Sequence, residues 1–145
     1  MRVIKPKNTN NYFLDANIFI RFLRQDGPID QQHVSLRVFN ALQEKIITGS
    51  IHTLVVSEIL YVLIGVYKVK KRAAVKALIS LLSLDTIEVV DVEKPVLIAA
   101  MQQYGMRSVD FQDCFYAALV ANQGLALISF DQDFKKLGVE SRTAF

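Results

Sequence analysis

The sequence predicts an α/β protein in which a mostly parallel sheet is covered on both faces by helices. Short apolar runs of strand length alternate with longer helical patterns along the chain. Such an alternation requires crossover connections, which place helices on both faces of a parallel sheet. No linker, repeat or low-complexity tract interrupts it, and 145 residues suit a single core. We therefore expect one domain over residues 12–145, preceded by a polar extension over residues 1–11.

Each element follows from a local pattern. Strands are expected over the apolar runs at residues 12–14, 51–55, 87–90 and 125–129. One helix is expected from apolar positions 38, 39, 42 and 46, with Gly49 as its stop, and another from positions 74, 78, 81 and 82. Pro95 suits the first turn of a further helix. In open parallel sheets, functional residues gather at the carboxyl ends of the strands.

Composition narrows the class of protein. Hydrophobic residues make up 52% and charged residues 21%, which excludes a disordered chain and predicts a homodimer or a hydrophobic partner. The longest charge-free apolar stretch, residues 59–67, is well short of the roughly 20 residues that span a bilayer, so we expect no membrane association. A single cysteine, Cys114, and the lack of a secretion signal indicate the cytoplasm.

Four acidic residues lie at positions where a folded protein normally has an apolar residue or gains little stability from a carboxylate. Each follows a strand-like run or interrupts an apolar helix. The four residues are Asp15, Glu58, Asp113 and Asp131. Asp15 is either a helix N-cap or a carboxylate at a strand tip, and Asn17 is the better cap because apolar residues follow it. Glu58 is the sole charged residue among residues 55–66, so we expect it to lie on a buried helix. The alternative is that Glu58 lies in the first turn of its helix, where the helix dipole favours a negative charge, with Ser57 or a neighbour as the N-cap.

The remaining acids also have two explanations each. Asp110 and Asp113 have the spacing of a capping box at the start of a helix over residues 111–122. We favour Asp110 as the cap and Asp113 as a ligand, because small and apolar residues follow Asp113. Asp131 and Asp133 lie in a turn after a strand, where aspartates are common. The functional interpretation places Asp131 beside Asp15 across adjacent strands, with Asp133 as a further ligand or as the cap of a short turn.

A tight group of carboxylates needs a counter-charge. Two unit charges about 4 Å apart repel by about 4 kcal/mol at an effective dielectric constant of about 20. A divalent cation removes that repulsion, and oxygen-only ligands favour Mg²⁺ or Mn²⁺ over zinc. His33 and His52 stand in no metal-ligand spacing, and we expect both to be ordinary surface or strand-edge residues. A modest excess of basic residues, 17 against 14, suits a polyanion that approaches this acidic site.

The order and spacing of the acids resemble those of the PIN-domain ribonucleases, particularly the VapC-type toxins of bacterial and archaeal toxin-antitoxin pairs. The matching segments are Phe13-Leu14-Asp15-Ala16-Asn17, Val56-Ser57-Glu58-Ile59-Leu60, Asp110-Phe111-Gln112-Asp113-Cys114 and Ser129-Phe130-Asp131-Gln132-Asp133-Phe134. Each segment is weakly specific by itself, but the four occur in this order across most of the chain.

This resemblance implies a three-layer α/β/α sandwich and an endoribonuclease that hydrolyses RNA with water activated by one or two Mg²⁺ or Mn²⁺ ions. It implies that Asp15, Glu58 and Asp113 are the central acids, with either Asp131 or Asp133 as the fourth. Asn17 and Ser129 would orient them. Candidates for holding the phosphate backbone, each equally explained as a solvated surface charge, are Arg21, Arg24, Lys68, Lys70, Lys71, Arg72 and Arg107.

The toxin interpretation also predicts a cognate antitoxin as partner. Two alternatives within the same fold are a housekeeping nuclease of RNA maturation or repair and a non-catalytic RNA-binding module. A phosphotransfer domain with Asp15 as nucleophile is disfavoured, because Asn17 stands where a second aspartate is needed.

Overall fold

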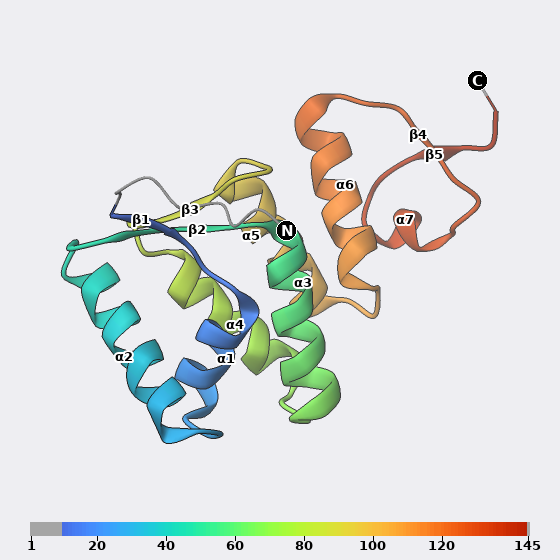
Figure 1. The fold of residues 1–145 in the computed structure, drawn as a ribbon. Helices are drawn as coiled ribbons and strands as arrows, with labels where there is room; N and C mark the ends of the chain where they lie inside the picture. The colour runs from blue at the N-terminus through green and yellow to red at the C-terminus, as the bar shows by residue number, and fades with distance from the viewer. Residues whose placement is uncertain (1–9, 145) are drawn as a thin grey trace, which may run out of the picture.

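The computed structural model describes residues 10–144, so residues 1–9 of the expected extension lie outside the described residues. It confirms an α/β protein with a parallel sheet (Figure 1). The elements, in chain order, are β1 (Asn11–Phe13), α1 (Ala16–Arg24), α2 (Ile29–Gln43), β2 (Thr48–Ile51), α3 (Thr53–Tyr61), a π-helical turn η1 (Val62–Val66), α4 (Lys71–Leu82), β3 (Ile87–Val89), α5 (Lys94–Met106), α6 (Phe111–Gln123), β4 (Leu127–Ile128), α7 (Asp133–Lys136) and β5 (Ser141–Arg142).

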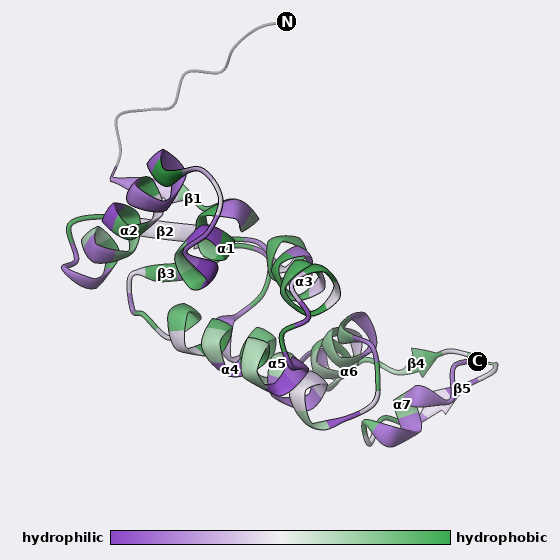
Figure 2. Ribbon diagram, turned by 90° about the horizontal axis from the view of Figure 1, so that it is seen from below, coloured by the Kyte–Doolittle hydropathy of each residue, from purple (hydrophilic) through white to green (hydrophobic). Residues whose placement is uncertain are grey.

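The strands form two parallel pieces. β1, β2 and β3 make one sheet in that order, with Tyr12 opposite Gly49 and Gly49 opposite Ile87. β4 and β5 make a separate pair, with Leu127 opposite Ser141. Figures 1 and 2 both place this pair at the end of the molecule away from β1.

The core lies between the three-stranded sheet and the helices packed on it. Gly49, Ile51 and Ile87 are buried on one face of the sheet, while Ser50 and Glu88 alternate to the other side. In the view of Figure 1, helices α1, α2 and α4 lie below the strands. Apolar residues concentrate on α3 and along α4 and α5 (Figure 2). Each helix among residues 10–144 is too short or too polar to cross a lipid bilayer.

The strand predicted over residues 51–55 was wrong, because β2 ends at Ile51 and α3 begins at Thr53. The side chain of His52 accepts a 3.0 Å hydrogen bond from the backbone N–H of Leu54, which starts a helix inside the apolar run. Gly49 does not stop the preceding helix, which ends at Gln43. Gly49 instead lies in β2, where an added Cβ would be 2.5 Å from Cδ1 of Leu14.

Most of the helices follow the pattern that predicted them. The helix after the basic cluster is α4, with Ala74, Leu78 and Leu82 buried. Pro95 lies in the first turn of α5, and α6 begins at Phe111 as expected. Strands β1, β3 and β4 coincide with predicted runs to within one or two residues at each end.

Candidate functional site

Three aspartates come together near the start of α6. Asp113 is the third residue of that helix, Asp131 lies in the loop after β4, and Asp133 is the first residue of α7, with Gln132 rather than Asp133 in the N-cap position. Each offers one carboxylate oxygen, and the three oxygens lie within 4.8 Å of one another. Asp113 and Asp133 are half-buried, whereas Asp131 is exposed. The group is therefore open to solvent on one side.

The loop after β4 is held in shape by short side-chain hydrogen bonds. The backbone N–H of Asp131 donates to Oγ of Ser129 at 3.0 Å. The backbone N–H of Asp133 donates to Oδ1 of Asp131 at 2.8 Å. Lys136 donates from Nζ to Oδ1 of Asp133 at 2.6 Å, and this bond raises the pKa of Lys136. Two carboxylates are thus fixed beside Asp113 by the local sequence.

The pKa of the Asp113 carboxyl is raised, first by burial and then by the negative charges of Asp131, Asp110 and Asp133. Three carboxylates that repel one another in this way attract a cation to the space between them. The donor set is three carboxylates with no histidine or cysteine, which is the ligand chemistry of Mg²⁺ and Mn²⁺. Ligand oxygens on opposite sides of one Mg²⁺ lie about 4.2 Å apart. The three aspartates therefore fit a hard divalent cation after small movements of their side chains.

Basic groups lie beside the same helix end. Nζ of Lys71 donates a 2.7 Å hydrogen bond to the carbonyl oxygen of Arg107 and stands 4.3 Å from the ring centre of Tyr104. The pKa of the buried Cys114 thiol is raised chiefly by burial, while the charges of Lys71 and Arg107 act in the opposite direction. These two cations lie beside the residues that precede α6, on the side of Cys114, whereas the groups that shift the pKa of Asp113 are burial and the neighbouring aspartates.

Asp15 and Glu58 lie outside this group of three carboxylates. Asp15, rather than Asn17, occupies the N-cap position of α1, although its side chain makes no capping hydrogen bond. Asn17 is the second residue of α1, and both side chains are exposed. Asp15 follows Leu14 at the carboxyl end of β1, which is where the sequence placed it.

Glu58 was expected on a buried helix, but its side chain is exposed. Helix α3 buries Val55, Val56 and Ile59 and leaves Glu58 on its solvent side, so burial gives no separate argument for a bound cation there. The first-turn alternative is also wrong, because α3 begins at Thr53 with His52 rather than Ser57 as its cap.

The predicted phosphate-binding residues divide into two groups. Arg21 is engaged with Asp26 at 3.3 Å and with Gln31 at 3.1 Å, and the guanidinium of Arg24 stacks 4.9 Å from the ring centre of Tyr67. These cations stabilise the end of α1. Lys71 and Arg107 lie beside the residues that precede α6, and Lys68, Lys70 and Arg72 are exposed.

Two residues that position α3 were not identified from the sequence as structural groups. His52 caps the helix, and Oδ1 of Asp91 accepts a 3.0 Å hydrogen bond from the backbone N–H of Thr53. Nε2 of His52 also lies 3.6 Å from Oδ2 of Asp91. The signal in the sequence was a polar side chain immediately before an apolar helical run, which is typical of an N-cap.

A family model described as the PIN domain matches residues 12–140. A search of the curated proteins finds no match. The family match covers most of the chain, and it confirms the α/β/α fold class expected from the sequence.

Proposed function

This chain belongs to the PIN-domain family, whose members are in general metal-dependent nucleases, and on that premise we propose that it is an endoribonuclease. The observation that carries the proposal is the set of three aspartate oxygens within 4.8 Å of one another at the start of α6. Asp113, Asp131 and Asp133 would hold Mg²⁺ or Mn²⁺. Asp15 and Glu58 would complete the site as further acids, with Asn17 and Ser129 as orienting groups.

A bound divalent cation would supply a Lewis acid that activates water and stabilises the leaving oxygen of a phosphodiester. The chain's own residues would hold and orient that chemistry. Ser129 and the backbone of Asp133 keep Asp131 in place through their hydrogen bonds. Burial raises the pKa of the Cys114 thiol, which disfavours a cysteine nucleophile and supports attack by water.

Positive charge near the aspartates supports a polyanionic substrate. Lys71 and Arg107 lie beside the residues that precede α6, the helix that carries Asp113, so they would attract a phosphate backbone to this end of the helix. Arg72, on the same helix as Lys71, would extend this basic surface. Arg21 and Arg24 already contact groups at the end of α1, so they would bind a longer RNA only by giving up some of these contacts.

The direct test is cleavage of labelled single-stranded RNA with Mg²⁺, with Mn²⁺ and with EDTA. We expect cleavage that depends on the cation and falls at least a hundredfold in Asp113→Asn. A matched control is Glu44→Gln, an exposed acid after α2 that should keep full activity. Equal cleavage by Asp113→Asn and wild type, at equal thermal stability, would refute the assignment. RNA binding without cleavage would favour the non-catalytic alternative.

We further propose that the ribonuclease is the toxin of a toxin-antitoxin pair, acting in the cytoplasm. The exposed apolar side chains Leu54 and Tyr61 lie about two helical turns apart on α3 and support a protein partner. Growth arrest on expression, relieved by Asp113→Asn, would support a toxin. Normal growth with an active enzyme would favour a housekeeping nuclease of RNA maturation or repair.

A further inference from the structure

A small pocket lies between α1 and α2, close to the candidate acid Asp15. Its volume is about 210 Å³, and side chains of both helices line it. Pockets for whole cofactors and drug-sized ligands usually have volumes of about 300–1,000 Å³. The pocket between α1 and α2 therefore suits one flat ring system rather than a complete nucleotide.

Helical spacing places the lining residues on the faces that α1 and α2 turn toward each other. Asn17 and Arg21 are four residues apart on α1, and Gln31 and Ser35 are four residues apart on α2. Nε of Arg21 donates a 3.1 Å hydrogen bond to Oε1 of Gln31, which joins the two helices at the pocket. Asn17 follows Asp15 by two residues. A ligand in the pocket is therefore held near the carboxyl end of β1.

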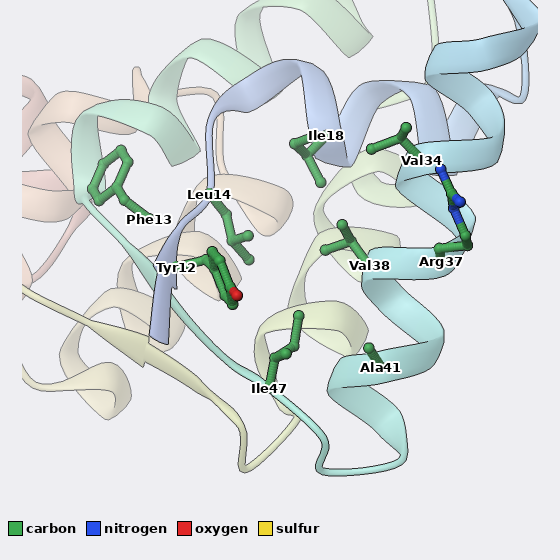
Figure 3. A pocket seen from close by; sticks show the side chains of 9 residues that line it. All are labelled: Tyr12, Phe13, Leu14, Ile18, Val34, Arg37, Val38, Ala41 and Ile47. Carbon is green, nitrogen blue, oxygen red and sulfur yellow. The ribbon is translucent and has the colours of Figure 1, made fainter. Parts of the chain in front are cut away.

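Two apolar side chains form walls that a flat ring can contact. Ile18 and Val34 line the pocket, and both also line a larger groove of about 400 Å³ beside β1. Figure 3 shows Ile18 and Val34 on the two facing helices. Enzymes that bind an unstacked base commonly hold its faces between apolar side chains. The larger groove is lined mainly by apolar side chains, so it has few groups to distinguish one base from another.

Two hydrogen-bond donors of the pocket are held in place. Arg21 uses its Nε and Nη1 atoms to contact Gln31, Oδ1 of Asp26 at 3.3 Å and the hydroxyl of Tyr67 at 3.4 Å. Its Nη2 atom has no hydrogen-bond partner among residues 10–144. Because Arg21 occupies Oε1 of Gln31, the amide nitrogen of Gln31 is left as a second donor. Donors that are positioned before a ligand arrives lower the ordering cost of binding.

Asp30 supplies the acceptor of the pocket and a balancing charge. It lies in the first turn of α2, and it is exposed. Within the described part of the chain its carboxylate has no hydrogen bond or ion pair. The charges of Asp30 and Arg21 cancel, and a phosphate in the pocket would meet the like charge of Asp30. The pocket therefore favours a neutral ligand that has both donors and acceptors.

A buried hydroxyl without a partner also points to a ligand here. Ser35 is 1% exposed, and its Oγ atom has no hydrogen-bond partner among the described residues. Buried polar groups without partners are rare in folded proteins, and each one weakens the fold. Ser35 lines the pocket one turn after Gln31, so a ligand group that bonds its hydroxyl offsets that cost.

We propose that this pocket binds an unpaired guanine of the RNA substrate and so determines which bond is cut. Guanine offers two adjacent donors, N1–H and the N2 amino group, and two adjacent acceptors, O6 and N7. The two donors match the carboxylate of Asp30, and the two acceptors match the donors of Arg21 and Gln31. A bound guanine fixes the position of the RNA relative to Asp15. The role in cleavage rests on the proposed function, whereas the binding of the base needs no metal.

Titration with single nucleotides tests the pocket without any cleavage. The isotope-labelled full chain is kept in EDTA and titrated with guanosine, adenosine, cytidine and uridine monophosphates. The side-chain amide signals of Asn17 and Gln31 are followed by NMR. We expect them to shift with the guanosine nucleotide at concentrations about tenfold or more below those that the other three nucleotides need. Equal shifts with all four nucleotides, or no shift with the guanosine nucleotide, would overturn the proposal.

Two pocket variants and one control locate the binding. Asp30→Asn should lose the preference for the guanosine nucleotide, because the carboxylate that accepts two hydrogen bonds is gone. Ser35→Ala removes a hydroxyl that has no partner in the protein, so it should keep its melting temperature and bind the guanosine nucleotide about threefold to tenfold more weakly. Glu44→Gln, at the other end of α2, should match the wild type. Guanosine nucleotide binding that is unchanged in both pocket variants would overturn the proposal.

Cleavage of RNA tests the link to the proposed function. Sequencing of the ends cut from a random RNA pool should show guanine at one fixed distance from the cut bond. Replacing that guanosine by inosine removes only the N2 amino group, and it should slow cleavage by the wild type about tenfold and by Asp30→Asn much less. Cleavage without a base preference would overturn the proposal and leave the ribonuclease assignment intact. Selective guanosine nucleotide binding by a chain that cuts no RNA would support the guanine pocket and count against the proposed function.

Discussion

The backbone N–H of Asp133 donates a 2.8 Å hydrogen bond to Oδ1 of Asp131. This single bond closes the turn that presents two carboxylates to Asp113, so it links local loop structure to the candidate metal site. The same oxygen cannot both accept this bond and turn freely into solvent. Asp131 therefore has a structural role and a ligand role at once, and the two can be separated by substitution.

Asp131→Asn should keep the turn and lose the charge. The amide oxygen still accepts the hydrogen bond, so we expect a melting temperature close to that of the wild type and a loss of at least a hundredfold in cleavage. Asp131→Ala removes the acceptor as well and should cost about 1 kcal/mol of stability in addition. Thermal melts and RNA cleavage of both variants check this. Equal melting temperatures of Asp131→Asn and Asp131→Ala would show that the hydrogen bond accepted by Asp131 does not stabilise the fold.

Mg²⁺ or Mn²⁺ should stabilise the folded chain. A cation that binds only the folded state at 100 times its dissociation constant adds about 2.7 kcal/mol. For a chain of this size, that corresponds to a rise of about 5–10 °C in melting temperature. Asp113→Asn should show a much smaller rise, and Glu44→Gln should match the wild type. Differential scanning fluorimetry with and without EDTA measures the effect.

The stability of the cation-free protein should fall as pH rises through the titration of Asp113. Its pKa is raised above the ordinary value of 3.8, so the folded state binds the proton more tightly than the unfolded state does. The contribution is present at pH below 3.8 and is lost as pH passes the raised pKa. The difference in unfolding free energy between wild type and Asp113→Asn, measured in urea with EDTA, isolates this effect. The unfolding free energy of Asp113→Asn should rise relative to that of the wild type as pH increases from acidic to neutral. A difference in unfolding free energy that does not change with pH would contradict the raised pKa of Asp113.

Gly49→Ala should destabilise the fold through crowding in the core. The added Cβ would lie 2.5 Å from Cδ1 of Leu14 and 3.3 Å from Cδ2 of Leu42. Overpacking of this kind typically costs about 1–3 kcal/mol. Gly65→Ala is the matched control, because its Cβ would meet only Cε2 of Tyr61 at 3.9 Å and alanine favours helical backbone. Urea unfolding of both variants gives the comparison.

The sequence predicted the fold class and most helices because periodicity reports which face of an element is buried. It failed at residues 51–55, where Ile51, Leu54 and Val55 suit a strand by composition. The hydrogen bonds that His52 and Asp91 accept from the backbone N–H groups of Leu54 and Thr53 stabilise the start of a helix there. Neither contact can be read from periodicity, because Asp91 lies 38 residues from Thr53.

The candidate site was predictable where it depends on neighbours in sequence. The turn that joins Ser129, Asp131 and Asp133 is local chemistry, and the structure has it. The exposure of Glu58 was not predictable, since periodicity does not show which side of an almost wholly apolar helix remains in contact with solvent. The expected position of Asp131 beside Asp15 needed β4 to pair with β1, and strand order depends on contacts between distant segments rather than on either segment alone.

Asp113 belongs to α6, whereas Asp131 and Asp133 belong to the segment that follows β4. A cation held by all three carboxylates would therefore fasten the part of the chain that follows α6 to that helix. Chelation would release that fastening, so a protease should cut the C-terminal segment sooner in EDTA than in Mg²⁺.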